Sequence, residues 1–341
     1  MLGIGKGGAG WLIMAGLFVG VFFMTYAAEP EVRRASFWGE DWESAPLAER
    51  VHVLPAGALP SLRDGLSDHH FISKVAPARN AKYVIKDIQK AIGELPSPVK
   101  DMVAGHLIGI FLVEGLAQSE NSDSLGMAFE VFGFWRQHVG TVILIDRNDT
   151  DMRANQAMAG MEYVPSQDYY GMAVAPRLAG RSENDRVTTL RYVLLHEMGH
   201  LVDFAYDIVP NAFSHKNPKS GCGFACLSWV NPTQHRHSRW IDAAMEQIRK
   251  GNHDEYVKGL PKTFKRLERS NFPSLYAATM PQEDFAESFA MYVHTVMMSK
   301  PWELTLRQNG TIVAELSSCF VDGRCPKKRD YFDRLFAEAG R

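Results

Sequence analysis

The sequence predicts an α+β fold, a small mixed sheet with helices packed on it, from three observations. Apolar residues recur every three or four positions between Asn80 and Leu95, which is the period of an amphipathic helix. Two short β-branched runs, His106–Val113 and Thr141–Ile145, are bounded by turn residues and are typical of buried strands. A second helical pattern runs from Asp185 to Phe204. Helices packed on a small sheet form one of the few stable layered architectures.

Outside these segments, the sequence patterns before residue 185 are weaker. Residues 28–75 are polar and weakly periodic, so we expect an N-terminal extension wrapped on a main domain at residues 76–341. Residues 148–170 are expected to form a loop. Gly171–Pro176 is a candidate strand at a sheet edge, because its closing proline cannot donate to a neighbouring strand.

The second half of the chain is expected to form a helical subdomain. Asp185 is a suitable cap for the helix that follows it. Residues 208–238 are irregular and form an insertion, and a helix resumes over Arg239–Lys250. Another helix starts at Thr279, because Thr279 and Gln282 have the spacing of a capping box and a proline stands between them.

Composition bounds the function only loosely. Of the 341 residues, 46% are hydrophobic and 22% are charged, which is enough apolar content for a substantial core. The formal net charge of −2 provides no basic excess to neutralise phosphates. We therefore expect a folded, soluble body and exclude a dedicated nucleic-acid-binding protein.

The N-terminus has the pattern of an export signal. Lys6 precedes an apolar run without charges, Ala9–Tyr26, and Thr25 and Ala27 stand at the −3 and −1 positions of a cleavage site. We interpret residues 1–27 as a signal peptide, with an uncleaved membrane anchor as the alternative because the apolar run is long. With either one, the body of the chain is secreted or periplasmic, and only an uncleaved anchor would contact a membrane.

The four cysteines agree with export. Cys222 and Cys226 form one close pair, and Cys319 and Cys325 form another. Three connectivities are possible, and in an oxidising compartment two local disulfides, 222–226 and 319–325, are the simplest. A four-cysteine zinc site is the alternative, but neither pair has the usual two-residue spacing.

The strongest motif is His196-Glu197-Met-Gly-His200, on the helix predicted over 185–204. Histidines four positions apart lie on one helical face, so both imidazoles can bind a single ion. Glu197 lies about 100° further around the helix, beside that ion, where it can act on a bound water. The pattern predicts one Zn²⁺ with His196 and His200 as ligands and Glu197 as the catalytic carboxylate.

A catalytic zinc needs a third protein ligand. A metzincin would need glycine at position 203 and histidine at position 206, where this chain has Asp203 and Tyr206, which excludes that class. His235 and His237 are a further candidate pair, although we expect them at the rim of the site. Stronger candidates are Glu283 and Glu287, four residues apart among apolar neighbours, and their spacing does not decide between them.

Two blocks together resemble a known family. His196-Glu-Met-Gly-His200-Leu-Val-Asp203 and Tyr276-Ala-Ala-Thr-Met-Pro-Gln-Glu283-Asp-Phe-Ala-Glu287-Ser-Phe289 resemble the catalytic domain of anthrax lethal factor and its gluzincin relatives. The resemblance covers about residues 187–295, and about 80 residues separate the two blocks here. It implies a zincin-like metallopeptidase fold, with Glu283 as the third zinc ligand and Tyr276 as a catalytic residue.

The resemblance also implies a mechanism. The zinc ion lowers the pKa of its water and polarises the scissile carbonyl. Glu197 takes the proton of that water and later delivers it to the leaving amine, while Tyr276 donates a hydrogen bond to the oxyanion. Glu287 or Asp203 is expected to orient a ligand histidine through its second nitrogen.

The expected function is therefore an exported zinc metallopeptidase with a peptide or protein substrate. Two alternatives stay open. One is a zincin scaffold that only binds, with zinc structural or absent, although such a module needs neither Glu197 nor Tyr276. The other is a peptidase that acts on cell-wall peptides. Gly171–Pro176 and the 208–238 insertion are expected to line the cleft.

Overall fold

The structure is a computed structural model, and it describes residues 30–39, 41–66, 70–119, 122–123, 125–148, 151–161, 171–210, 222–236, 239–250 and 252–339. The predicted signal peptide or anchor at residues 1–27 lies outside these residues, as do residues 211–221 of the predicted insertion. Within the described ranges, no helix is both long enough and apolar enough to cross a membrane.

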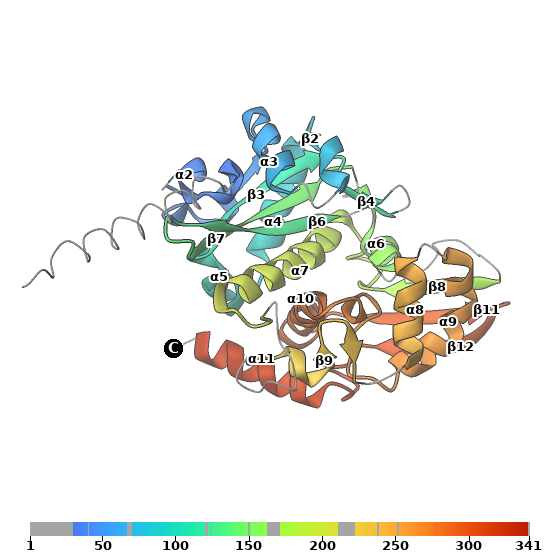
Figure 1. Cartoon of the computed structure of the whole chain (residues 1–341). Coiled ribbons are helices and arrows are strands. Elements are labelled where there is room, and N and C mark those ends of the chain that lie inside the picture. The colour runs from blue at the N-terminus through green and yellow to red at the C-terminus, as the bar shows by residue number, and fades with distance from the viewer. Residues whose placement is uncertain are drawn as a thin grey trace, which may run out of the picture.

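A mixed sheet forms the centre of the N-terminal part (Figure 1). Its strands β1 (Val51–Val53), β3 (Leu107–Glu114) and β7 (His138–Asp146) are parallel, whereas β6 (Gly126–Phe132) is antiparallel to β7 and β2 (Ala76–Pro77) is antiparallel to β3. The order β1-β3-β7-β6 makes β6 a terminal strand. The predicted α+β class with a small mixed sheet is confirmed, and β3 and β7 are the two predicted strands.

Both faces of this sheet are buried, which explains why its central strands are continuous apolar runs. On β7, Ile143 and Ile145 face one core, and Val142 and Leu144 face the other. The first core is closed by three helices, α4 (Lys82–Gly93), α5 (Ser97–Ala104) and α7 (Arg186–Tyr206). The helices predicted near 80–95 and 185–204 are α4 and α7.

Residues 30–75 close the second face of the sheet. Leu54, Leu62 and Leu66 of this segment pack against the apolar side chains of β3, β6 and β7. Beyond the predicted wrapping, the segment also supplies β1, a strand too short for its alternation to be recognised in the sequence. Its other elements are η1 (Glu31–Arg33), α2 (Ala35–Trp38), η2 (Asp41–Glu43), η3 (Leu47–Glu49), η4 (Ala56–Ala58), α3 (Leu59–Gly65) and η5 (His70–Lys74).

A second sheet has three antiparallel strands in the order β12-β11-β8. They are β8 (Met172–Arg177), β11 (Glu303–Gln308) and β12 (Thr311–Ser317). The strand predicted at 171–176 is therefore an edge strand, as expected, but it pairs with β11. The remaining described strands form two separate antiparallel pairs. These are β4 (Ala117–Ser119) with β5 (Ser122–Asp123), and β9 (Trp229–Asn231) with β10 (Gln234–His235).

The segment predicted as a loop at 148–170 contains a helix, α6 (Ala154–Met161), so that prediction is wrong there. Its buried residues Ala154, Ala157 and Met158 do have helical spacing. The helix is short, and its apolar residues are mostly small, which makes the period weak in the sequence.

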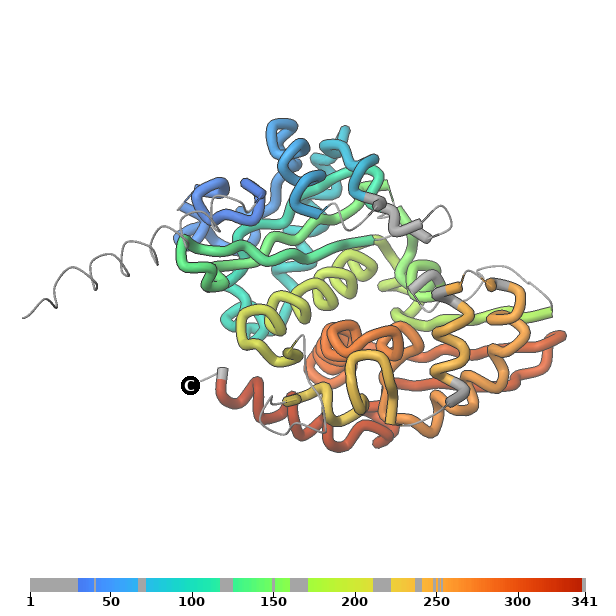
Figure 2. Tube along the Cα trace, viewed as in Figure 1, coloured from blue at the N-terminus to red at the C-terminus, as the bar shows by residue number. Residues whose placement is uncertain are grey.

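The C-terminal part is mainly helical. Its helices are α8 (Arg239–Arg249), α9 (His253–Leu267), α10 (Pro281–Tyr292) with a π-helical continuation η10 (Val293–Met297), and α11 (Pro326–Ala339), with short turns η8 (Ala225–Leu227) and η9 (Tyr276–Ala278). Figure 2 shows α10, α11 and the second sheet on the side of α7 away from the main sheet. Cysteine pairs 222–226 and 319–325 form the two local disulfides that the sequence favoured.

The start of α10 differs from the prediction. Its N-cap is Met280, which provides no side-chain cap, while Pro281 occupies the first turn as expected. The hydroxyl of Thr279 instead donates to the Tyr276 carbonyl, at 2.7 Å. The predicted capping box is therefore wrong, because Thr279 closes the preceding turn η9.

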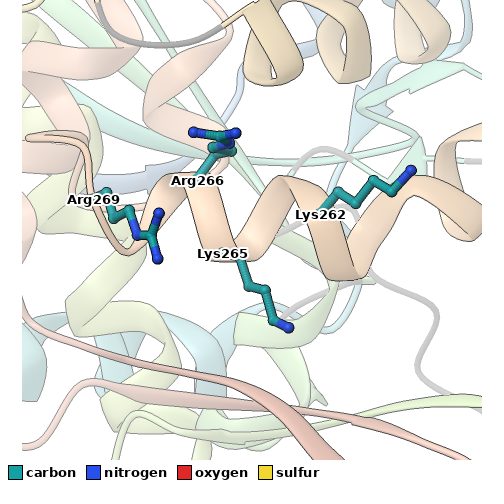
Figure 3. A pocket seen from close by; sticks show the side chains of 4 residues that line it. All are labelled: Lys262, Lys265, Arg266 and Arg269. Carbon is teal, nitrogen blue, oxygen red and sulfur yellow. The ribbon is translucent and has the colours of Figure 1, made fainter.

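The outer face of α9 is basic. Lys262, Lys265 and Arg266 are exposed along its last turns, and Arg269 is exposed just after its end (Figure 3). On the opposite face, Leu260, Phe264 and Leu267 are buried. α9 is thus an amphipathic helix whose solvated side carries positive charge near the negative end of the helix dipole.

Candidate metal centre

Helix α7 carries the HExxH residues in the interior of the protein. The carboxylate of Asp185 accepts a hydrogen bond from the backbone N–H of Thr188 at 2.9 Å, which confirms the predicted N-cap of α7. The helix is covered by α4 and the main sheet on one side and by α10 on the other, as Figure 1 shows. His196 and Glu197 are consequently only 6% and 5% exposed.

Helix α10 packs against α7 at a glycine. A Cβ atom at Gly199 would lie 2.6 Å from the Cα of Ala286, so only glycine permits this separation of the two helices. The contact lies one turn from Glu283 on α10 and beside His200 on α7. The middle of the HExxH motif therefore sets the distance at which α10 presents its acidic residues.

Three potential metal ligands meet at this interface. The Oε2 atom of Glu283 lies 3.0 Å from His196 Nε2 and 3.3 Å from His200 Nε2, and the two Nε2 atoms are 3.2 Å apart. Among the described residues, this is the group of three or more His, Cys, Asp or Glu that could hold a metal ion. A tetrahedral ion with bonds of about 2.0–2.1 Å separates its ligand atoms by about 3.3 Å, so the spacing fits.

Glu287 lies behind this group, one turn after Glu283. Its Oε2 accepts a hydrogen bond from His196 Nδ1 at 3.1 Å, and its Oε1 accepts one from the Tyr192 hydroxyl at 2.6 Å. The bond to Nδ1 leaves His196 Nε2 directed at the ligand group. Of the two residues considered for this orienting role, the structure brings Glu287 to a histidine.

Asp203, the other residue, lies near the C-terminal end of α7 and bonds to the turn that follows this helix. Its carboxylate accepts the backbone N–H of Val209 at 2.6 Å and thereby ties down the end of α7. Burial raises the pKa of Asp203 to about 7. No hydrogen bond joins its described atoms to a histidine, so its place in the motif reflects the structure of the turn after α7.

The charges around the ligand group favour a cation. Burial opposes protonation of His196, but its hydrogen bonds to Glu283 and Glu287 outweigh burial and hold the pKa of His196 well above its ordinary value. For His200, burial is likewise outweighed by Glu283, and its pKa is raised. The histidines in turn overcome the effect of burial on Glu283 and lower the pKa of that carboxyl. One carboxylate and two imidazole nitrogens are donors that suit a divalent metal ion, and a further carboxylate holds one imidazole in place.

Glu197 stands next to the ligand group in a confined position. The backbone N–H of Ala128 on β6 donates to its carboxylate, and burial raises the pKa of Glu197. A Cβ atom at Gly126 would lie 2.7 Å from Glu197 Oε1, so β6 approaches the carboxylate as closely as a glycine allows. The other oxygen, Oε2, is buried and has no protein hydrogen-bond partner within the described residues. An acceptor in this position is suited to a water molecule or a substrate N–H.

Tyr276 forms the side of the cleft next to His196. Its ring centroid lies 5.4 Å from that of His196. The turn η9 that carries Tyr276 is fixed by the Thr279 hydroxyl and by His235, whose Nε2 donates to the Ala278 carbonyl at 2.8 Å. His235 is thus a buried support for the turn; the expectation that it lies at the rim is wrong, and His237 lies outside the described residues.

A cleft of about 280 Å³ opens over these residues. It is lined by Arg33, Leu66, Gly126, Met127, Ala128, Phe129, Glu130, His196, Glu197, His200, Phe204, Tyr276, Gln282 and Glu283. The expectation that Gly171–Pro176 and the 208–238 insertion line the cleft does not hold for their described residues. The wall is β6, together with Arg33 and Leu66 of the N-terminal segment.

Two functional positions were missed in the sequence. Gly126 begins a strand, and an isolated glycine in a strand pattern is a known sign of close backbone approach. Tyr192 lies one turn before His196, on the same face of α7, so its contact with the partner of that histidine follows from helical spacing. Gly126 does not stand out because no strand is predicted over 126–132, and the spacing of Tyr192 gains meaning only once Glu287 is seen beside His196.

The centre thus combines a three-donor group, a buried carboxylate beside it and a tyrosine in one cleft. These residues come from α7, η9 and α10, and α7 is far from the other two elements in the sequence. Comparison of the chain with protein-family models, with curated proteins and with solved structures found no match.

Proposed function

We propose that the chain is an exported, zinc-dependent peptidase of the gluzincin type with a zincin-like fold. The observation that carries this proposal is the group of His196, His200 and Glu283, whose donor atoms lie within 4.8 Å of one another beside Glu197. Two histidines and one glutamate are a recurrent ligand set of catalytic zinc, which keeps one coordination position open. The resemblance of the two motif blocks to gluzincins supports the same assignment.

Zinc bound by these residues would supply a Lewis acid that polarises the substrate carbonyl and lowers the pKa of a water molecule. Glu197 would take the proton of the attacking water at Oε2, the oxygen without a protein partner, and then pass it to the nitrogen of the leaving amine. Its raised pKa suits a group that must both accept and return a proton near neutral pH.

Tyr276 and β6 would position the substrate. The Tyr276 hydroxyl would donate a hydrogen bond to the developing oxyanion, a contribution of roughly 3 kcal/mol in comparable sites. β6 is the terminal strand of its sheet, and its residues Gly126–Glu130 line the cleft. An extended peptide would therefore lie along β6 in the cleft.

Export is supported by the N-terminal signal pattern and is compatible with the two disulfides. Among the substrates considered, peptides and proteins in general fit an open cleft beside a strand edge. Cell-wall peptides belong to the same reaction class and are included in the test below.

The test compares the wild type with Glu197→Gln in two assays. We expect both proteins to bind one equivalent of zinc, while Glu197→Gln hydrolyses a mixed library of linear and cell-wall peptides about 10²- to 10⁴-fold more slowly. His196→Ala is the control that loses zinc. Undiminished hydrolysis by Glu197→Gln would refute the proposed base. Zinc binding without hydrolysis of any peptide by the wild type would favour a scaffold that only binds.

A further inference from the structure

The first turn of α10 holds a second acidic residue, Asp284, directly after the ligand Glu283. Successive helical residues point about 100° apart, so Glu283 faces α7 while Asp284 faces the other side of α10. Asp284 is completely buried. Its Oδ2 accepts a hydrogen bond from Trp229 Nε1 at 3.1 Å, and its Oδ1 accepts one from the Ser288 hydroxyl at 3.4 Å. Oδ1 also forms an ion pair with the ammonium group of Lys328.

Lys328, on α11, is also completely buried, although lysine is almost never found in such a position. Its ammonium lies over two aromatic rings, 5.2 Å from the centroid of Phe224 and 5.1 Å from that of Phe272. The cation is therefore enclosed by two ring faces and one carboxylate.

Two residues that form this enclosure lie in or next to the two disulfide loops. Phe224 lies inside the loop closed by Cys222 and Cys226, and Lys328 follows Cys325, the end of the other loop, by three residues. Both loops therefore restrict where the partners of Asp284 can lie. A buried ion pair is a costly way to join two helices, because apolar residues of similar volume are often as stabilising or more so. A hydrogen-bonded ion pair is directional, however, so it fixes the relative position of the two helices more narrowly than apolar contacts would.

The first turn of α10 requires a restraint of this kind to fix its orientation. Its N-cap, Met280, provides no side-chain hydrogen bond, so the first turn lacks the usual restraint. Because a helical turn is rigid, holding the Asp284 side chain holds the rotation of the turn and with it the direction of Glu283.

We propose that Lys328 is a positioning residue of the metal centre, which holds Glu283 at His196 and His200 through its ion pair with Asp284. The proposal rests on the zinc site proposed above, but not on the reaction catalysed there. It assigns a role in zinc binding to a side chain on the C-terminal helix that lines no part of the cleft.

The test uses the double variant Lys328→Met with Asp284→Asn, which removes both charges and so leaves no unpaired ion in the core. We expect its zinc affinity, measured by competition with a chelator, to fall about 10- to 100-fold. The visible spectrum of the cobalt-substituted protein should also change, because it reports the arrangement of the ligands. Tyr292→Phe is the matched control: it removes a hydrogen bond from the other end of α10 to Asp333 on α11, at 2.5 Å, and should keep both zinc affinity and spectrum.

Trp229→Phe is the second variant, since it removes only the indole donor to Asp284 and keeps an aromatic ring. We expect its zinc affinity to fall as well, but by less than in the double variant. If the double variant does not fold, Trp229→Phe alone tests the positioning role. Wild-type affinity and an unchanged cobalt spectrum in the folded double variant, or in Trp229→Phe, would overturn the positioning role while leaving the zinc site intact. Absence of zinc binding by the wild type would instead refute the proposed site itself.

Discussion

Gly126 and Glu197 show how closely single residues are fitted in the candidate centre. The backbone N–H of Ala128 donates to the Glu197 carboxylate, and a Cβ atom at Gly126, two residues earlier on β6, would lie 2.7 Å from Glu197 Oε1. The carboxylate thus has little freedom, although Oε2 keeps an unfilled hydrogen-bonding position within the described structure. Such confinement would suit the proposed role of Glu197 as general base, because proton transfer depends on a fixed distance to the water.

Gly126→Ala tests this confinement. The added methyl group would lie 2.7 Å from Glu197 Oε1 and must displace the carboxylate. We expect kcat for peptide hydrolysis to fall about 10- to 100-fold, with zinc binding unchanged because the three ligands are not touched. The control is Gly105→Ala, where the new methyl group meets no atom within 4 Å. A kcat equal to the wild-type value in Gly126→Ala would show that the carboxylate is not confined by β6.

At the scale of elements, the centre is an interface between α7 and α10. Each helix contributes a pair of residues four positions apart, His196 and His200 on α7 and Glu283 and Glu287 on α10. The two pairs meet because the helices approach closely at Gly199. The candidate metal centre is therefore expected to be sensitive to the separation of the two helices, even where none of its three donor residues is altered.

Gly199→Ala should push α10 away from α7. Overpacking against the Ala286 backbone should lower the free energy of unfolding by about 1–3 kcal/mol, which exceeds the gain of up to about 1 kcal/mol from the better helix propensity of alanine. Zinc affinity should fall as well, because Glu283 moves with α10. The measurements are urea unfolding and chelator competition.

Gly259→Ala is the matched control for that substitution. It lies in α9, and its methyl group would meet no atom within 4 Å, so we expect a gain of about 0.5–1 kcal/mol. If Gly199→Ala were stabilising by the same amount, the close contact between α7 and α10 would not constrain the helices.

On the scale of the whole molecule, His294 connects α10 to the second sheet behind the candidate metal centre. It lies in the π-helical continuation of α10, completely buried, and its Nε2 lies 2.9 Å from the Leu178 carbonyl and 3.0 Å from the Pro301 carbonyl. Leu178 follows β8 and Pro301 precedes β11, and these two strand ends are paired neighbours, so one neutral imidazole links α10 to a single end of the second sheet. Its ring also packs edge-on against Tyr192, whose hydroxyl donates to Glu287 in the candidate metal centre.

This histidine should make stability depend on pH. Burial lowers the pKa of His294 to about 4, against about 6.5 in an unfolded chain. Because the folded-state pKa is the lower one, the unfolded state takes up the proton first. The stabilisation is therefore present above about pH 6.5 and is lost as the pH falls towards 4. The contribution of His294 to the free energy of unfolding should fall by about 2 kcal/mol between pH 7 and pH 5.

Urea unfolding of the wild type and His294→Gln at pH 7, 6 and 5 measures this contribution. We expect the variant to be less stable at pH 7 and to lose less stability on acidification. Burial also lowers the pKa of His138, to about 4, so the variant should keep part of the acid dependence. His52→Gln, on the exposed side of β1, is the control. Parallel pH profiles of wild type and His294→Gln would contradict the assignment.

The local features of this protein were predictable because they depend on short-range geometry. Histidines at positions i and i+4 share a helical face wherever the helix lies, and Asp185 caps that helix through a neighbour three residues away. The cysteine pairs are close in the sequence, so their local disulfides were the simplest expectation. β3 and β7 were recognisable because both their faces are buried, whereas β1, β6, β11 and β12 are shorter or half-polar and went unrecognised.

Tertiary structure decided which distant residues meet these local features. The sequence offered Glu287 and Asp203 as partners of a ligand histidine, and the packing of α10 on α7 brings Glu287 to His196 and leaves Asp203 in a turn. It also decided that β6, with Gly126 against Glu197, forms the cleft wall, and that Lys328 reaches Asp284 from the last helix. Spacing along the chain determines which side chains share a helical face; which face meets which depends on how whole elements bury their apolar surfaces.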